Sequence, residues 1–384
     1  MKLSKIEFNN HPILKNLKVN FSKENGERYG TIVFVGENGC GKTTLLNEIF
    51  NYDDSEYIVN KEPNDTLFGI IPRRCLLIPQ DIKYRNAINN AREKIDGIQV
   101  YSDITNVDEA NYPQSMNVLS LNRDNVANST IMFEESVCEF DNERISDYFK
   151  GSPQKLMDDT SGLLALDHSI EHSKADTLSS GEQEIILRLE ALKNRMQLSL
   201  DIVLLDEPET SLHPKWQLRV LPYVIKLLKN RKTDENDIQL FVSSHSENVL
   251  KSAFKQKDTL IVRLFKENGE IKSQSIMSMD SCLPEITIAE IQYLVFDIPS
   301  VEYHNQLYGR LLLEYDEKQK KIEDYFESKH VKKNPYNYPG KCGIESLPTF
   351  VRNASSHPEN AERQYEESDV KESIEILRGL IKKR

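Results

Sequence analysis

The apolar and polar positions of the first 80 residues predict strands followed by one helix. Residues 2–8 (KLSKIEF) and 17–22 (LKVNFS) alternate apolar and polar side chains, as half-buried strands do. Residues 31–35 (TIVFV) form a continuous, largely β-branched run that is typical of a buried parallel strand. The pattern then changes to a helical period over 43–50 (TTLLNEIF), and a further apolar run follows at 75–80 (CLLIPQ).

A second region of alternating strands and helices begins near residue 178. It predicts a helix over 181–198, a buried strand over 201–206, a helix over 214–229 and a strand ending at His245. Such an alternation favours an α/β fold with a parallel sheet flanked by helices. The intervening residues, about 81–177, predict a helical and irregular insert without a sustained heptad.

After about residue 280 the strand patterns stop. The sequence from Pro284 onward is charged, amphipathic and helical in its period, and it predicts an all-α C-terminal domain. We therefore place a domain boundary after residue 282, which divides the chain into an α/β domain at 1–282 and a helical domain at 283–384.

Composition and charge restrict the function classes. The chain has 384 residues, with 49 Lys and Arg against 61 Asp and Glu, so a uniformly basic nucleic-acid coat is excluded. Any DNA or RNA contact must be local, and the pairs at 73–74 and 83/85 are the candidates. No apolar run approaches the roughly 18 residues of a membrane span, and the N-terminal residues lack the apolar segment of a signal peptide. We expect a cytoplasmic protein without membrane contact.

The segment Gly36–Thr43 (GENGCGKT) predicts a phosphate-binding loop. It fits G-x-x-x-x-G-K-[ST] and lies between a buried strand and the start of a helix, where the mechanism requires it. Backbone N–H groups would surround a β-phosphate, Lys42 would reach the β- and γ-phosphates, and the Thr43 hydroxyl would ligate Mg²⁺. The predicted nucleotide-binding residues here are Gly36, Asn38, Gly39, Gly41, Lys42, Thr43 and Thr44.

Two acids at the end of the strand IVLLD predict the catalytic edge of the sheet. Asp206 would complete the Mg²⁺ shell, and Glu207 is placed to orient and deprotonate the attacking water. The plainer alternative is an acidic cap of a following helix with Pro208 at its first position.

Three further segments point to one class of ATPase. LSSGEQE at 178–184 offers the Ser179 hydroxyl and the Gly181 N–H to an anion, and His245 directly follows a strand. With Gln80, these segments resemble the ABC-type ATPases: GENGCGKT as Walker A, Gln80 as the Q-loop and a Mg²⁺ ligand, LSSGEQ as the signature, LLDEPE as Walker B, SLHP (211–214) as the D-loop and His245 as the switch histidine.

This resemblance covers roughly residues 1–280 and implies a shared site for ATP and Mg²⁺. In that family the domains pair head to tail, so that Ser179 and Gly181 of one subunit contact the γ-phosphate held by Lys42 of another. It implies a homodimer or higher oligomer through the ATP interface, with Glu207, His245 and Lys42 catalytic. Ser180 and Glu182 depart from the transporter signature, as SLHP does from the usual D-loop, and these features resemble the soluble OLD-type, RecF-like and AAA-family ATPases.

Two short motifs lie outside this assignment. His168–His172 spells HxxEH, an inverted zinc-protease pattern, for which a polar helix face is the plainer interpretation. Arg352, Asn353 and His357 fit RNxxxH and resemble the motif of HEPN domains, whose Arg and His cleave RNA. The same Arg and His could instead satisfy carbonyls at a helix end or pair with acids at a domain interface.

The whole arrangement resembles the ATPase subunits of bacterial anti-phage systems that hold or release a nuclease partner. It implies an ATPase that assembles head to tail and gates an effector nuclease, with the C-terminal domain docking the partner. Two alternatives stay open at this point: an ATP-regulated HEPN-type RNase that uses its own C-terminal domain, and the nucleotide-binding subunit of a transporter.

Overall fold

The protein consists of two compact units, residues 1–275 and 276–384. A computed structural model describes residues 2–52, 55–61, 75–78, 201–210, 212–229, 238–315, 318–338, 341–357 and 364–382. Several predicted features lie outside these residues: the insert, the HxxEH segment, the basic pairs at 73–74 and 83/85, Gln80, Ser179 and Gly181.

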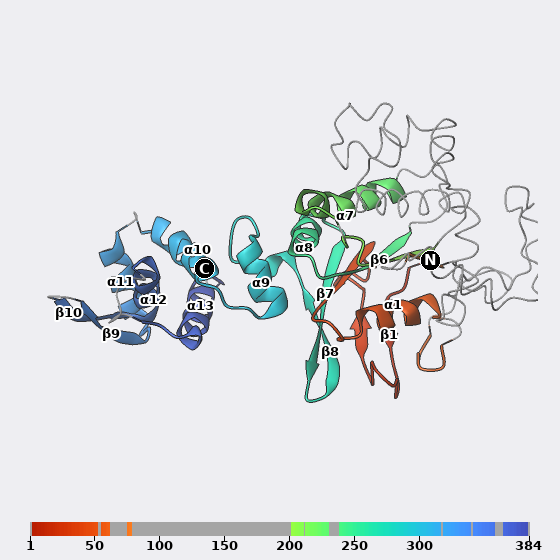
Figure 1. The fold of residues 1–384 in the computed structure, drawn as a ribbon, viewed down its shortest axis with the longest axis horizontal. Helices are drawn as coiled ribbons and strands as arrows, with labels where there is room; N and C mark the ends of the chain where they lie inside the picture. Colours follow the sequence, from red (N-terminus) through yellow and green to blue (C-terminus); the bar gives the residue numbers. More distant parts are fainter. Residues whose placement is uncertain are drawn as a thin grey trace, which may run out of the picture. The chain divides into compact units, whose positions relative to one another are not determined.

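The N-terminal unit is an α/β domain, as its alternating pattern predicts (Figure 1). Its elements are β1 (Lys5–Glu7), β2 (Lys18–Asn20), β3 (Thr31–Val35), α1 (Lys42–Phe50), β4 (Cys75–Ile78), β5 (Ile202–Asp206), α7 (Pro214–Lys229), β6 (Gln239–Ser244), α8 (Glu247–Phe254), β7 (Thr259–Glu267) and β8 (Glu270–Ile276).

The central sheet has the strand order β4-β5-β6-β3-β7-β8. The five strands from β4 to β7 pair in parallel, and β8 returns along β7 after a turn at Asn268–Gly269, where both residues have positive φ. Strand β6 lies between β3 and β5, with Val35 opposite Ser244 and Asp206 opposite Ser243. The ends of the three strands therefore meet at one edge of the sheet, the edge at which parallel α/β sheets bind ligands.

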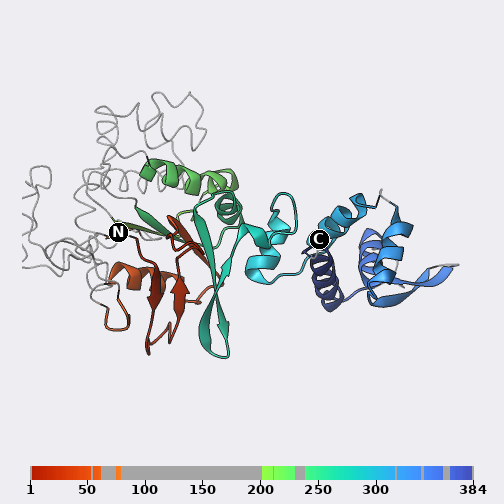
Figure 2. The ribbon, with the colours of Figure 1, turned by 180° about the vertical axis from the view of Figure 1, so that it is seen from behind.

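Both faces of this sheet are covered, which explains its continuous apolar strands. Ile32 and Phe34 of β3 belong to the same core as Leu45 of α1, whereas Val33 and Val35 alternate with them and point to the opposite face. Figures 1 and 2 show α1 on one side of the sheet and the neighbouring helices α7 and α8 on the other. This arrangement confirms the predicted parallel sheet between two layers of helices.

The C-terminal unit is mainly helical. Its buried core is formed chiefly by α10, α12 and α13, which contact one another, together with two side chains of α11. The elements are a 3₁₀ turn η6 (Ser278–Asp280), α9 (Ile288–Phe296), α10 (Val301–Leu313), α11 (Gln319–Ser328), β9 (Lys333–Tyr338), β10 (Lys341–Ser346), α12 (Leu347–Ser356) and α13 (Glu367–Lys382).

The expectation that this unit is all-α is wrong in one segment. Strands β9 and β10 form an antiparallel hairpin in which Tyr338 pairs with Lys341. The cluster of Asn, Pro and Gly residues there resembles a loop between helices, but two residues between strands are also enough to close a hairpin. The flanking tyrosines favour strands, and Pro335 is tolerated because the ribbon consists of two edge strands.

The division after residue 275 lies close to residue 282, where the change from strand to helical patterns predicts the boundary. Hydrogen bonds explain why the intervening residues join the C-terminal unit. The Glu290 carboxylate, 0% exposed, accepts from the Cys282 N–H at 2.6 Å and from the Tyr303 hydroxyl at 2.9 Å. Arg378 of α13 donates to the Asp280 carbonyl at 2.9 Å. In the part of the chain that the structure describes, no helix combines the length and apolar character of a membrane span.

The buried His304 of α10 makes the stability of the C-terminal unit depend on pH. Burial lowers the pKa of His304 from 6.5 to about 4. Its Nδ1 contacts the Asn305 amide oxygen at 3.1 Å, and its Nε2 has no hydrogen-bond partner among the described residues. The unfolded chain therefore binds more protons at this site between pH 6.5 and 4, so the unit loses about 3 kcal/mol as the pH falls through that window.

We expect His304→Gln to remove this loss, because glutamine does not titrate. Denaturant unfolding of both proteins at pH 7.5, 5.5 and 4.5, followed in the C-terminal unit, measures the difference. Parallel pH dependence in the two proteins would show that His304 does not control it.

Candidate functional site

The loop between β3 and α1 takes a conformation that requires its glycines. Gly36, Gly39 and Gly41 have φ of 146°, 75° and 87°, where other residues are strained. A Cβ on Gly36 would lie 2.1 Å from the Leu264 carbonyl oxygen and 2.8 Å from Cys40 Sγ. The chain passes too close to β7 for any side chain at this position, and this close approach explains the first glycine of the motif.

Helix α1 begins directly after this loop, at Lys42, with an N-terminus suited to an anion. Its N-cap is Gly41, no side chain caps the first turn, and no acidic residue lies in that turn. The helix dipole is therefore not neutralised by a carboxylate of its own. Lys42 is only 5% exposed, and its ammonium donates to the carbonyl oxygens of Gly36 at 3.0 Å and Glu37 at 3.1 Å. Phosphate oxygens could accept from the same ammonium group.

Asp206 joins the phosphate loop to the neighbouring strands. Thr43 Oγ1 lies 3.0 Å from Asp206 Oδ2 and donates to it, and the Ser243 hydroxyl donates to Asp206 Oδ1. Asp206 is 6% exposed, so its carboxylate is held by these two hydroxyls at the buried sheet edge. A threonine hydroxyl and a carboxylate beside a phosphate loop are the oxygen ligands that Mg²⁺ takes in such sites, so the residues present fit this ion.

Glu207 is fixed in an unusual backbone conformation. Its φ is 44°, in the left-handed region, and its N–H donates to Ser243 Oγ at 3.1 Å and to the Ser243 carbonyl at 3.2 Å. Its carboxylate Oε1 lies 2.9 Å from His245 Nε2. A strained residue with its side chain held by a second functional group is a feature of reactive sites. No helix begins at Pro208, because α7 begins at Pro214, so the interpretation of Glu207 as a helix cap is wrong.

The environment of His245 keeps its ring largely uncharged. Burial, together with the nearby Lys42 ammonium, lowers the pKa of His245, while the carboxylates of Glu207 and Asp206 oppose this shift. In the neutral ring the proton belongs on Nε2, where it is donated to Glu207. The neutral histidine can therefore orient the Glu207 carboxylate by a hydrogen bond and leave it free to accept a proton.

Two polar side chains at this edge, Ser243 and Glu209, are not among the residues predicted from the sequence. Ser243 is 0% exposed and bridges Asp206 and Glu207, and Glu209 is 6% exposed and contacts the loop that carries His245. A signal for Ser243 exists in the sequence: the apolar strand β6 ends in two serines, and both are completely buried. Of the other predicted residues, Asn38 is exposed and Thr44 is half-buried on α1.

The predicted second site lies around the end of α12. Arg352 Nη1 donates to the Asn353 side-chain oxygen at 2.8 Å, and Asn353 Nδ2 donates to Glu345 Oε2 at 3.0 Å. His357 is exposed and follows α12 as its C-cap, with its N–H donated to the Ala354 carbonyl at 3.2 Å. The arginine is thus turned toward Asn353, and RNA cleavage at this motif stays a prediction.

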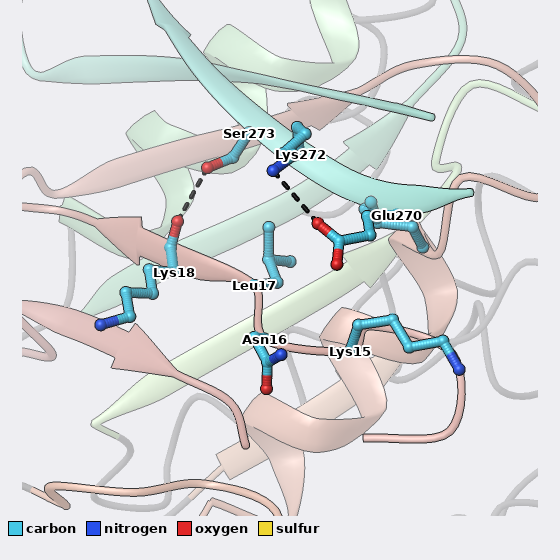
Figure 3. A pocket seen from close by; sticks show the side chains of 8 residues that line it. Lys15, Asn16, Leu17, Lys18, Glu270, Lys272 and Ser273 are labelled. Carbon is cyan, nitrogen blue, oxygen red and sulfur yellow. Dashed lines mark hydrogen bonds and ion pairs between the residues drawn. The ribbon is translucent and has the colours of Figure 1, made fainter. Parts of the chain in front are cut away.

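A separate surface pocket of about 250 Å³ lies between the segment before β2 and strand β8 (Figure 3). The Ser273 hydroxyl donates to the Lys18 carbonyl at 2.8 Å, and Lys272 pairs with Glu270 at 3.2 Å. No residue of the phosphate loop lines this pocket, so it is not the predicted triphosphate site. Its lining residues are Lys15, Asn16, Leu17, Lys18, Glu270, Ile271, Lys272 and Ser273.

Residues 81–251 match the family described as "AAA domain, putative AbiEii toxin, Type IV TA system". The matched segment contains Asp206, Glu207 and His245 and begins after the phosphate loop. This similarity over part of the chain agrees with the ATPase motifs of the sequence.

The chain is also similar to longer or more distant proteins. It is 25% identical over 264 residues to "Multidrug resistance protein 1" of Plasmodium falciparum. The aligned region covers 63% of this chain and 17% of that protein. The chain thus spans less than a fifth of the length of the curated relatives it matches. Among solved structures, a dimeric bacterial ABC transporter cassette has a TM-score of 0.34 and 16% identity, over 72% of this chain and 97% of that one. The structure titled "RNase-L Inhibitor" has a TM-score of 0.35 and 15% identity, over 94% of this chain and 48% of that one.

Gly36→Ala should destabilise the N-terminal unit by about 2–3 kcal/mol, because the new methyl group meets the Leu264 carbonyl. Gly309→Ala is the control, because Gly309 lies in helix α10 and a Cβ there would have no neighbouring atom within 4 Å. This substitution should stabilise the C-terminal unit by about 0.5–1 kcal/mol, since alanine favours a helix over glycine. Calorimetric unfolding measures both. Unchanged stability of the Gly36 variant would contradict the described loop.

Proposed function

We propose that this protein binds ATP with Mg²⁺ and hydrolyses it to ADP and phosphate. The observation that carries the proposal is the contact of Thr43 with Asp206 at 3.0 Å beside the Glu207–His245 pair at 2.9 Å. It brings the phosphate loop, a metal-binding carboxylate and a candidate base to one edge of the sheet. The AAA-family match over residues 81–251 supports the same activity.

Each residue then has a distinct task. The loop N–H groups and Lys42 bind the β- and γ-phosphates, and Thr43 and Asp206 would hold Mg²⁺, which neutralises phosphate charge when bound. Glu207 orients the attacking water and accepts its proton, and the His245 Nε2–H holds the Glu207 carboxylate in place. The water oxygen forms a bond to the γ-phosphorus while the bond to the ADP oxygen breaks, with the charge stabilised by Lys42.

The active form in this proposal is a head-to-tail assembly of two chains. The ABC-type resemblance of LSSGEQ supports it, because Ser179 and Gly181 of one chain would then face the γ-phosphate bound to Lys42 of another. Each hydrolytic site is therefore composite, and two chains close two sites.

The proposed role of this cycle is to gate an effector nuclease in anti-phage defence. The compact C-terminal unit would dock the partner, and ATP binding would build the assembly. The matched family is described as a putative toxin of a type IV TA system, which supports a role in such a conflict system.

A second candidate function is the nucleotide-binding subunit of a transporter. The 25% identity to "Multidrug resistance protein 1" over 264 residues favours it. It predicts that the protein co-purifies with membranes through a membrane partner, whereas the gating proposal predicts recovery with a nuclease.

Glu207→Gln should bind ATP with unchanged affinity and lose about 10²–10⁴ in kcat, because the amide cannot accept the proton of the attacking water. It should also trap the ATP-bound dimer. A phosphate-release assay and light scattering measure the two effects, and Glu267→Gln on the exposed end of β7 is the control. Normal turnover in the Glu207 variant would reject Glu207 as the base.

Mixing two inactive variants tests the composite site. Lys42→Ala removes the phosphate ligand and Ser179→Arg obstructs the opposing surface, so neither should hydrolyse ATP alone. A mixed dimer has one doubly mutated site and one intact site. An equal mixture should therefore recover about a quarter of wild-type activity if the two sites act independently. No recovery on mixing, with both variants folded, would argue against sharing between chains.

A further inference from the structure

One carboxylate oxygen of Glu209, in the loop after Asp206, accepts three hydrogen bonds from the loop that carries His245. Glu209 Oε1 accepts from the Ser244 hydroxyl at 2.6 Å, from the His245 N–H at 2.8 Å and from the Ser246 N–H at 3.2 Å. These donors lie at the start of α8, where backbone N–H groups have no partner within the helix. The second oxygen, Oε2, is buried and has no hydrogen-bond partner among the described residues.

Gln217 of α7 completes the attachment from the other side. Its Oε1 accepts from the Ser246 hydroxyl at 2.7 Å, and its Nε2 donates to the Leu212 carbonyl at 2.9 Å. Leu212 in turn donates its N–H to the Glu209 carbonyl at 3.0 Å. Glu209, Leu212, Gln217 and Ser246 thus form a closed ring of contacts, which we call the Glu209–Gln217 link.

Burying the Glu209 carboxylate is unfavourable, and its hydrogen bonds with the His245 loop offset this penalty. Burial raises the pKa of Glu209, and the hydrogen bond from Ser244 opposes that shift. A carboxylate with one buried, unpartnered oxygen is an unfavourable residue for packing alone. The three hydrogen bonds that it accepts all come from residues 244–246, and the positive end of α8 faces it. The contacts therefore fix the backbone of His245, whose ring Nε2 lies 2.9 Å from Glu207.

We propose that Glu209 and Gln217 are positioning residues for ATP hydrolysis, which hold the His245 loop and the segment after Glu207 as one unit. This inference rests on the proposed ATPase activity. Among the described residues, neither side chain is hydrogen-bonded to Lys42 or Thr43, so both act through His245 and Glu207 rather than on the nucleotide.

Steady-state hydrolysis and ATP binding of the full chain test the assignment. Glu209→Leu removes the acceptor and should lower kcat about 100-fold through misplacement of His245, with the Kd for ATP changed by less than about threefold. Glu209→Gln keeps an acceptor oxygen for all three donors and should recover most of the lost kcat. Gln217→Ala should lower kcat in the same direction, and Gln306→Ala is its control, a glutamine with comparable hydrogen bonds in the C-terminal unit.

Amide hydrogen exchange gives a readout that does not depend on activity. The N–H groups of His245 and Ser246 should exchange on the order of tenfold faster in Glu209→Leu but not in Glu209→Gln. A kcat loss as large in Glu209→Gln as in Glu209→Leu, or equal losses in kcat and ATP affinity, would overturn the positioning role. Wild-type protein that releases no phosphate, with the exchange difference present, would reject the proposed activity and leave the link itself intact.

Discussion

The site depends on one buried carboxylate, Asp206, held between two hydroxyls, one at the start of α1 and one on the neighbouring strand β6. Thr43 reaches it from the phosphate loop after β3, and Ser243 reaches it from β6, the strand between β3 and β5. Because the three strands are parallel and buried on both faces, their ends cannot separate without opening the core. The hydrophobic pattern of the strands therefore determines the position of the polar site.

Hydrogen bonds to these strands also hold the residues that follow Asp206 in fixed positions. Ser243 also accepts from the Glu207 N–H, which fixes a residue with φ of 44° and directs its carboxylate toward His245. Glu209, two residues further, accepts from the His245 N–H. Three acids within four positions thus have three different environments: one meets the phosphate loop, one meets a histidine side chain, and one meets the backbone of the histidine loop. In the proposed mechanism, this separation allows one short segment to serve metal binding, proton transfer and positioning.

Local motifs could be predicted from the sequence, and contacts between distant strands could not. The phosphate loop and the pair Asp206–Glu207 were identified because their chemistry depends on consecutive residues at the end of an apolar strand. Ser243 and Gln217 matter only because β6 inserts between β5 and β3 and α7 packs on α8, which no local pattern specifies. The hairpin of β9 and β10 was missed for another reason, since Pro and Gly punctuate loops and tight turns alike. The roles assigned to Ser179, Gly181 and Gln80 rest on the family resemblance, and these residues lie outside those that the structure describes.

The most direct test of the account is the rate of phosphate release from ATP and Mg²⁺ per chain, measured across a wide range of protein concentration. A nucleotide site shared between two chains predicts that this specific rate rises with concentration and then reaches a plateau as dimers form. A rate per chain that is constant from the lowest concentration upward, or no phosphate release at any concentration, would contradict it.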